Sequence, residues 1–236
     1  DRPNYIPLIC FKKKLKQIIL TLSIIVSGHL VFAQQDSVRV TEENVSSNIK
    51  LAYNSSIVYP GLKAGIELPF RKRIINKTKK SGKERHLFKE RLFSTNLGWY
   101  HHSTFHNNLY ITAGFTMRRT NQKGLFTEFS PELGYSRTFL GGTTYQVNEN
   151  SNVSIKKMAG YNYALVSLGV GLGYDFSVSK SKPIAIYSKI NMLTMFPYNS
   201  TIYIRPTVEL GIIYKPKNFL KFNSKTKHIH KDKSQL

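Results

Sequence analysis

The chain has 236 residues, with 35 Lys and Arg against 13 Asp and Glu, which gives a formal net charge of +22. Its single cysteine, Cys10, excludes an intramolecular disulfide framework, and its length is compatible with one domain. Such a basic balance favours nucleic acid, an anionic membrane surface or acidic glycans as partners.

Residues 12–33 have the organisation of a secretory signal peptide, with residues 1–11 as an upstream extension. A lysine-rich start precedes a short apolar run, and Val31-Phe32-Ala33 supplies small or β-branched residues at the cleavage positions. Since the run is shorter than the ~20 residues of a membrane-spanning helix, we expect cleavage after Ala33 and a mature chain from about Gln34. Residues 1–33 hold five basic residues and one acidic residue, so the mature charge would be +18. Export leaves nucleic acid as the least suitable partner.

Residues 34–56 form a polar segment without a sustained period, and we expect a periplasmic lead-in or the edge of a first strand there. From residue 61 onward, apolar and polar residues alternate, as in strands with one apolar and one polar face. Leu168, Val170 and Leu172 share one face in the clearest example, and the glycines between them share the other. The pattern predicts strands at 62–70, 93–100, 109–118, 125–136, 164–176, 184–196 and 202–214, with a short eighth strand at 143–147.

Eight strands, an even number with both ends on one side, predict an all-β fold: a closed antiparallel up-and-down transmembrane β-barrel at 57–215. Two long connections, at 71–90 and 148–160, then fall on the same side, which we expect to be extracellular. Residues 216–236 are rich in lysine and are expected to form a basic, disordered periplasmic tail.

The composition of the polar face separates a membrane barrel from a soluble one. A soluble lipocalin-like binder of apolar ligands would point its apolar face inward and expose many Lys and Glu side chains. Here the polar face is mostly Gly, Ser, Thr and Asn, which suits the narrow interior of an eight-stranded barrel. Aromatic residues such as Trp99 and Tyr214 lie near strand ends, where interface girdles belong. These features favour the membrane barrel.

Three features together resemble the small eight-stranded outer-membrane β-barrel proteins of Gram-negative bacteria. They are the signal peptide ending in VFAQQ, the alternation over 61–215, and the segment ELGIIY at 209–214. This segment is similar to the polar-x-Gly-x-x-aromatic signal of a final strand, so the resemblance implies that the barrel assembly machinery recognises Gly211 and Tyr214. Family chains usually end soon after this signal, whereas here the lysine-rich tail follows. The resemblance implies an outer-membrane location, outer-membrane lipid as the surroundings, and no cofactor.

Eight charged residues fall on inward-facing positions of the expected strands. We interpret them as a network of paired charges that fills the lumen, because buried charges need partners and an eight-stranded barrel has little further space. The alternative is a selective pore or a ligand site. The eight residues are Lys63, Glu67, Arg118, Glu128, Glu132, Lys189, Arg205 and Glu209.

His101-His102-Ser103 is the one arrangement that suggests catalysis. It is similar to the His-x-Ser pair of outer-membrane lipid A deacylases, in which a nearby Glu orients the base. Glu128 and Glu132 are the candidate orienting carboxylates, yet both are expected in the lumen, and the His-x-Ser pair is expected at the periplasmic end. We therefore interpret the histidines as interface residues, and the spacing of the histidines at 101–106 matches no recognised metal site.

The segment 71–91 carries ten basic residues against two acidic ones. On an extracellular loop it would face lipopolysaccharide phosphates, which Arg and Lys clusters bind well. The alternative is a mobile, solvated loop. The candidate phosphate-binding residues are Lys77, Lys79, Lys80 and Lys83. The whole pattern predicts a non-catalytic outer-membrane protein of structural or interaction type, with a membrane-embedded lipid hydrolase as the alternative.

Overall fold

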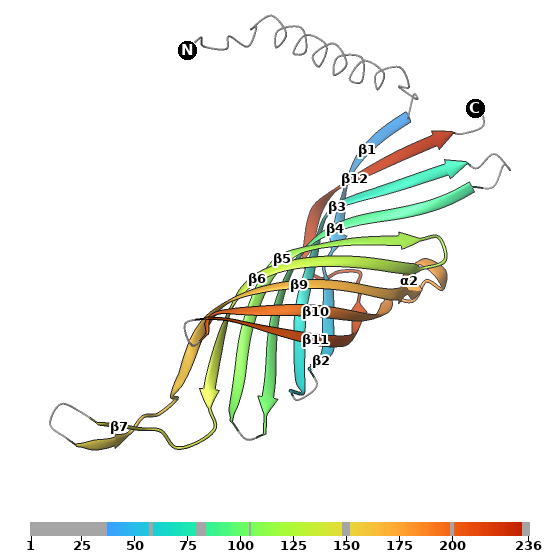
Figure 1. Ribbon diagram of the computed structural model, residues 1–236. Helices are drawn as coiled ribbons and strands as arrows, with labels where there is room; N and C mark the ends of the chain where they lie inside the picture. Colours follow the sequence, from blue (N-terminus) through green and yellow to red (C-terminus); the bar gives the residue numbers. More distant parts are fainter. Residues whose placement is uncertain are drawn as a thin grey trace, which may run out of the picture. The chain divides into compact units, whose positions relative to one another are not determined.

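The computed structural model describes residues 37–56, 59–78, 84–103, 105–147, 152–198 and 201–232. The expected signal peptide and the expected mature start at Gln34 lie outside the described residues. Almost all of the described part is β-strand (Figure 1). Within these ranges the helix α2 (Phe176–Ser179) has four residues, and no helix is long and apolar enough to cross a membrane.

Eight antiparallel strands pair side by side in a ring. Each strand pairs with the one before and the one after it, and the first pairs with the last, so the hydrogen bonding runs round all eight. The prediction of an all-β, antiparallel fold with eight such strands is confirmed. The strands are β2 (Asn48–Ser55), β3 (Gly61–Thr78), β4 (Glu84–His102), β5 (His106–Asn121), β6 (Leu125–Leu140), β9 (Gly160–Asp175), β10 (Ile184–Tyr198) and β11 (Thr201–Tyr214).

The alternation of side chains gives the ring an apolar outside and a polar inside. Successive residues of a strand point to opposite faces. In β9, Leu168, Val170 and Leu172 point outward and are exposed, whereas Ser167 between two such positions is buried. The other ring strands repeat this pattern, with buried Ser, Thr, Asn and charged residues inside. A lipocalin-like barrel that binds apolar ligands needs the reverse arrangement, with apolar side chains inside, so that alternative is wrong.

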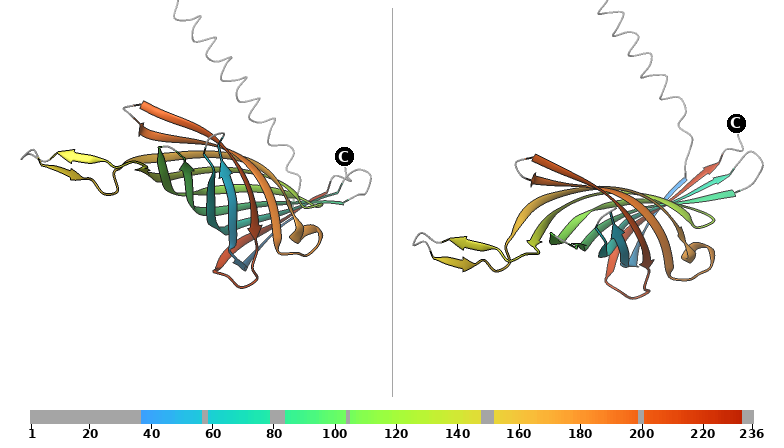
Figure 2. Two further views of the ribbon diagram at one scale, coloured as in Figure 1. Left: turned by 90° about the horizontal axis from the view of Figure 1, so that it is seen from below. Right: turned by 60° about the horizontal axis from the view of Figure 1, so that its bottom comes forward.

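The strand expected at 143–147 is not part of the ring. β7 (Tyr145–Val147) pairs with β8 (Val153–Ile155), and this hairpin projects from the connection between β6 and β9 (Figure 2). All three residues of β7 are exposed, and three residues are far fewer than the about 9–11 that cross a membrane. β2 takes the eighth place instead, and it lies in the segment 34–56 for which the sequence predicts a lead-in.

This exchange of strands changes which connections share an end of the ring. β2–β3, β4–β5, β6–β9 and β10–β11 are joined at one end, which we call the loop end. The opposite end holds the start of β2, the end of β11 and the β3–β4 connection, and we call it the terminus end. The prediction that the connections at 71–90 and 148–160 share a side is therefore wrong, because they lie at opposite ends.

Beyond the ring, at the terminus end, β3 and β4 continue as a sheet. Residues 71–78 of β3 pair in parallel with β12 (Lys221–Asp232), and β12 pairs antiparallel with β1 (Ser37–Ser46). We call β1, β12 and these parts of β3 and β4 the sheet extension (Figures 1 and 2). Residues 71–78 and 84–90 of the expected loop, and residues 221–232 of the expected disordered tail, are therefore strands, which corrects the prediction for those residues. Runs of Lys and Arg hide the strand pattern there, and β12 finds its partners far away in sequence.

Inside the ring, the side chains form three layers. A small apolar layer lies toward the terminus end, charged residues occupy the middle, and aromatic residues lie toward the loop end. Tyr187 fits because the residue opposite it on β11 is Gly211, where a Cβ atom would lie 2.6 Å from the tyrosine ring. Tyr110 lies over Gly98 in the same way. Glycine therefore makes room for large rings in a narrow interior.

Candidate functional site

Among the described residues, nine charged side chains point into the ring, besides Asp175 at its terminus end, and none of the nine is more than 4% exposed. Eight are the lumen residues named from the sequence. The ninth is Lys50. Sequence analysis does not predict it as a lumen residue, because its strand β2 lies in the segment 34–56, outside the strands assigned to the barrel. The cations are Lys50, Lys63, Arg118, Lys189 and Arg205, and the carboxylates are Glu67, Glu128, Glu132 and Glu209.

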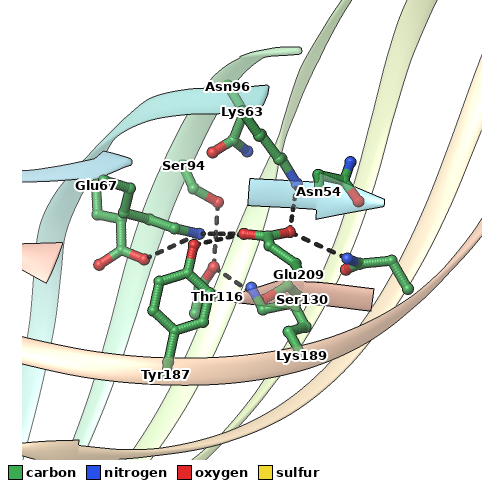
Figure 3. Close-up of polar contacts among 12 residues, drawn as sticks. Asn54, Lys63, Glu67, Ser94, Asn96, Thr116, Ser130, Tyr187, Lys189 and Glu209 are labelled. Atoms are coloured by element: carbon green, nitrogen blue, oxygen red, sulfur yellow. Dashed lines mark hydrogen bonds and ion pairs between the residues drawn. The ribbon is translucent and has the colours of Figure 1, made fainter. Parts of the chain in front are cut away.

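Glu209 on β11 lies at the centre of this cluster of charged side chains. Its carboxylate lies 3.3 Å from Nζ of Lys63 and 3.9 Å from Nζ of Lys50. It also accepts a hydrogen bond from the hydroxyl of Tyr187 (Figure 3). A further hydrogen bond comes from Nδ2 of Asn191, at 3.0 Å. These partners come from β2, β3 and β10, so one buried carboxylate joins four strands across the lumen.

Arg118 on β5 joins two further carboxylates. Its Nη2 atom lies 2.9 Å from Glu67 and 2.8 Å from Glu128. Nζ of Lys189 lies 2.6 Å from Glu128, and Nζ of Lys50 lies 3.6 Å from Glu67. Both carboxylates therefore face two cations each, which offsets the cost of removing charge from water.

Glu132 on β6 completes the set of buried carboxylates. It lies 3.2 Å from Nζ of Lys63 and accepts hydrogen bonds from Asn96, at 3.1 Å, and from Thr112, at 2.7 Å. Small hydroxyl groups fill the space between the charges. Ser94, Thr116 and Ser130 form a chain of two 3.1 Å hydrogen bonds (Figure 3). These charged and hydroxyl side chains therefore bond one another across the middle of the ring.

Arg205 does not join these ion pairs. Its guanidinium carbon lies 3.6 Å from the ring centroid of Tyr100 and 5.4 Å from that of Tyr59. Across the described ranges, the ion pairs do not include Arg205, and its Nε and Nη1 atoms are buried without a hydrogen-bond partner. The expectation that it pairs with a glutamate is wrong. Arg205 lies nearer the loop end than Glu209, in the aromatic layer.

A cavity of about 220 Å³ opens among these aromatic residues at the loop end. Its wall is largely tyrosine, and the rings of Tyr198 and Tyr203 stack at 4.8 Å. It offers apolar ring faces and hydroxyl groups, and its lining residues include no carboxylate. The lining includes Tyr59, Tyr100, Tyr161, Tyr163, Tyr198, Tyr203, His106 and Met195.

The His-x-Ser pair is not assembled into a hydrolase site. Nδ1 of His101 lies 2.8 Å from Oδ1 of Asn107, an amide in place of the carboxylate that would orient a base. Ser103 is exposed in the turn after β4, and both candidate glutamates lie in the interior, bonded to cations. The pair lies at the loop end of the ring, beside the connection between β4 and β5. In the described part of the chain, no group of three or more His, Cys, Asp or Glu could hold a metal.

The candidate phosphate-binding lysines are only partly described. Lys79, Lys80 and Lys83 lie outside the described residues, and the backbone of Lys77 pairs with Arg85 at the far end of β3. Because β3 and β4 join at the terminus end, this segment shares an end with the start of β2. The expectation that this segment lies on the same side as 148–160 is therefore wrong, and phosphate binding stays a prediction.

The residues of the expected assembly signal lie in the last strand of the ring. Tyr214 ends β11 and points outward, with 46% of its surface exposed. Gly211 points inward and has a packing reason of its own, since any side chain there would collide with Tyr187. Recognition by the assembly machinery stays a prediction.

Comparisons with known proteins add little to this geometry. No family model matches the chain, and no curated protein matches it. Among solved structures, the chain is similar to the crystal structure of neisserial surface protein A. The TM-score is 0.40 and the identity 12%, over 77% of this chain and 99% of that one. A likeness of this size carries no argument about location or activity.

Proposed function

We propose that the protein is an outer-membrane β-barrel of structural or interaction type, without catalytic activity and with a filled lumen. The inverted distribution of side chains carries this proposal. Leu51, Leu133 and Ile190 point out of the ring and are 61%, 67% and 66% exposed, while charged residues fill its inside. Monomeric soluble proteins rarely expose contiguous apolar patches beyond a few hundred Å². Lipid would cover this surface.

The backbone supports the same proposal. Strand pairing runs round all eight strands of the ring, and a closed sheet or a helix is the structure whose backbone groups are satisfied in hydrocarbon. Apart from β2, with eight residues, the ring strands have 14 to 19 residues, above the about 9–11 that a tilted membrane strand needs. Outer-membrane barrels have longer extracellular loops and short periplasmic turns. The longest connection, between β6 and β9, therefore supports a loop end that faces outward.

The interior supports a structural role over transport or hydrolysis. Each of the four carboxylates faces a cation, and none of the charged side chains is more than 4% exposed. An open channel would need solvated side chains along its length. A hydrolase would need a base and an orienting carboxylate together, which the surroundings of His101 do not provide.

Refolding into lipid vesicles followed by planar-bilayer recording tests the proposal. Insertion is measured first, by heat-modifiable gel mobility and protection from protease. We expect an inserted barrel that gives no steady conductance. Steady, porin-like conductance would contradict the filled lumen while keeping the membrane location. A chain that stays soluble and folded without lipid would contradict the membrane location itself.

A further inference from the structure

The outer face of the ring changes from apolar to basic over two rows of residues near the terminus end. Phe93 of β4 lies opposite Phe115 of β5, and both point outward. In the next outward row, Arg91 lies opposite Met117. In the row after that, Lys89 lies opposite Arg119. The apolar band therefore ends at this boundary, and a basic surface begins on the same face.

Strand register brings like charges side by side on this surface. Arg71 of β3 lies opposite Arg91, and Arg73 lies opposite Lys89. β12 adds one cation to each row, since Lys225 lies beside Arg71 and Lys227 beside Arg73. We call the seven residues the basic array: Arg71, Arg73, Lys89, Arg91, Arg119, Lys225 and Lys227.

The basic array has few carboxylates of its own. Five of its residues line a groove of about 220 Å³, and Glu90 is the one acidic residue among the described residues that line it. At the edge of the array, Glu42 lies 3.9 Å from Lys225, and both side chains are more than half exposed. Like charges directly opposite one another destabilise a sheet. Anions bound on the array would relieve this repulsion.

The surroundings of the array define the anion. Phe70, Phe93 and Phe115 form an outward aromatic cluster next to it, with ring centroids 5.7 and 6.0 Å apart. A ligand that fits this boundary has a hydrocarbon part along the aromatic rings and a phosphate on the cations, and Arg binds phosphate with paired hydrogen bonds. Resting on the proposed membrane location, we propose that the basic array binds the headgroups of anionic phospholipids in the leaflet at the terminus end.

Spin-labelled lipids in vesicles give a direct test with the full-length protein. The protein is refolded in phosphatidylcholine vesicles that contain spin-labelled phosphatidylglycerol or spin-labelled phosphatidylcholine, and the motionally restricted fraction of each label is measured. We expect phosphatidylglycerol to be preferred about threefold or more, as several cations at an anionic surface would give. The preference should weaken with salt, because the Debye length falls from about 10 Å at 0.1 M to about 3 Å at 1 M.

Two double variants of equal charge separate the array from general basicity. The double variant Arg73→Gln with Lys89→Gln should lose about half or more of the preference for phosphatidylglycerol over phosphatidylcholine. The control, Lys156→Gln with Lys157→Gln, removes two exposed cations at the loop end and should leave it unchanged. If the unmodified protein and both double variants preferred phosphatidylglycerol over phosphatidylcholine to the same extent, the proposal would be overturned. Displacement of the lipid by inorganic phosphate at matched ionic strength would also overturn it, because this would indicate a site for free phosphate. Insertion is checked for each variant, so failure of the membrane location is recognised separately.

Discussion

Replacing Glu209 with alanine tests the interior network at its most connected point. The change removes the carboxylate that faces Lys63 at 3.3 Å and Lys50 at 3.9 Å, and it leaves Asn191 and Tyr187 without their acceptor. The interior would then hold five cations against three carboxylates. Breaking a buried ion pair by removing one partner costs roughly 3–5 kcal/mol.

We expect the lower part of that range, about 3 kcal/mol of lost unfolding free energy. Lys63 keeps Glu132 at 3.2 Å, and Lys50 keeps Glu67 at 3.6 Å, so neither cation is left without a carboxylate. Glu42→Ala is the matched control. It removes a carboxylate from an exposed pair with Lys225, and exposed pairs contribute about 0–1 kcal/mol.

Equilibrium urea unfolding in vesicles measures both changes. Trp99 is the single tryptophan, and it lies on the outward face, so its fluorescence reports loss of contact with lipid. Heat-modifiable gel mobility gives an independent signal. Glu209→Gln, which keeps the shape and removes the charge, should lie between alanine and the unmodified protein. If Glu209→Ala cost no more than Glu42→Ala, the interior pairs would contribute nothing to closure of the ring, and the reasoning would fail.

Three further predictions follow from the export segment, the tail and the outer surface. N-terminal sequencing of the mature protein should begin near Gln34, and a mature chain that keeps residues 18–26 would contradict export. Deleting residues 218–236 should leave insertion intact, because the ring closes without β12, but should increase protease cleavage in residues 37–46; lost insertion would show that β12 is needed for closure. Leu168→Lys places a charge on the apolar outer surface and, with the proposed membrane location, should destabilise the barrel by about 2–4 kcal/mol near the bilayer midplane. Val153→Lys, at a similarly exposed site outside the ring, should change nothing measurable in the same unfolding assay.

The sequence predicts the ring well wherever one strand face is uniformly apolar. Leu168, Val170 and Leu172 show this face without ambiguity, and period 2 leaves one choice of inward residues. The inward glutamates and lysines follow directly from it. β2 carries the same signal, with Ile49, Leu51 and Tyr53 pointing outward, but it spans only three apolar positions. Because β2 is not predicted as a ring strand, the inward position of its Lys50 is not predicted either.

Other features depend on contacts that a local pattern does not contain. In residues 71–78, Ile74 and Ile75 are adjacent instead of alternating, so no apolar face is visible, and pairing with β4 and β12 makes the strand. For β7 the prediction errs in the opposite direction. Tyr145 and Val147 suggest the apolar face of a ring strand, but both side chains are exposed and lie outside the ring. The alternation along β11 correctly predicts that Arg205, like Glu209, points into the ring. It does not predict how far along the lumen Arg205 lies, nor that its guanidinium packs on the ring of Tyr100.

The sheet extension also affects how the ring can open sideways. β2 is the shortest ring strand, and it closes the ring by pairing with β11 from Ile49 to Ser55. Outside the ring the chain pairs its two ends a second time, through β1 and β12. Hydrogen bonds from Ser47 to the carbonyls of Phe219 and Leu220 join the two pairings. Separating β2 from β11, the movement that would admit a lipid or an incoming strand, therefore also disturbs β1 and β12. The ease of that movement depends on residues that take no part in the ring.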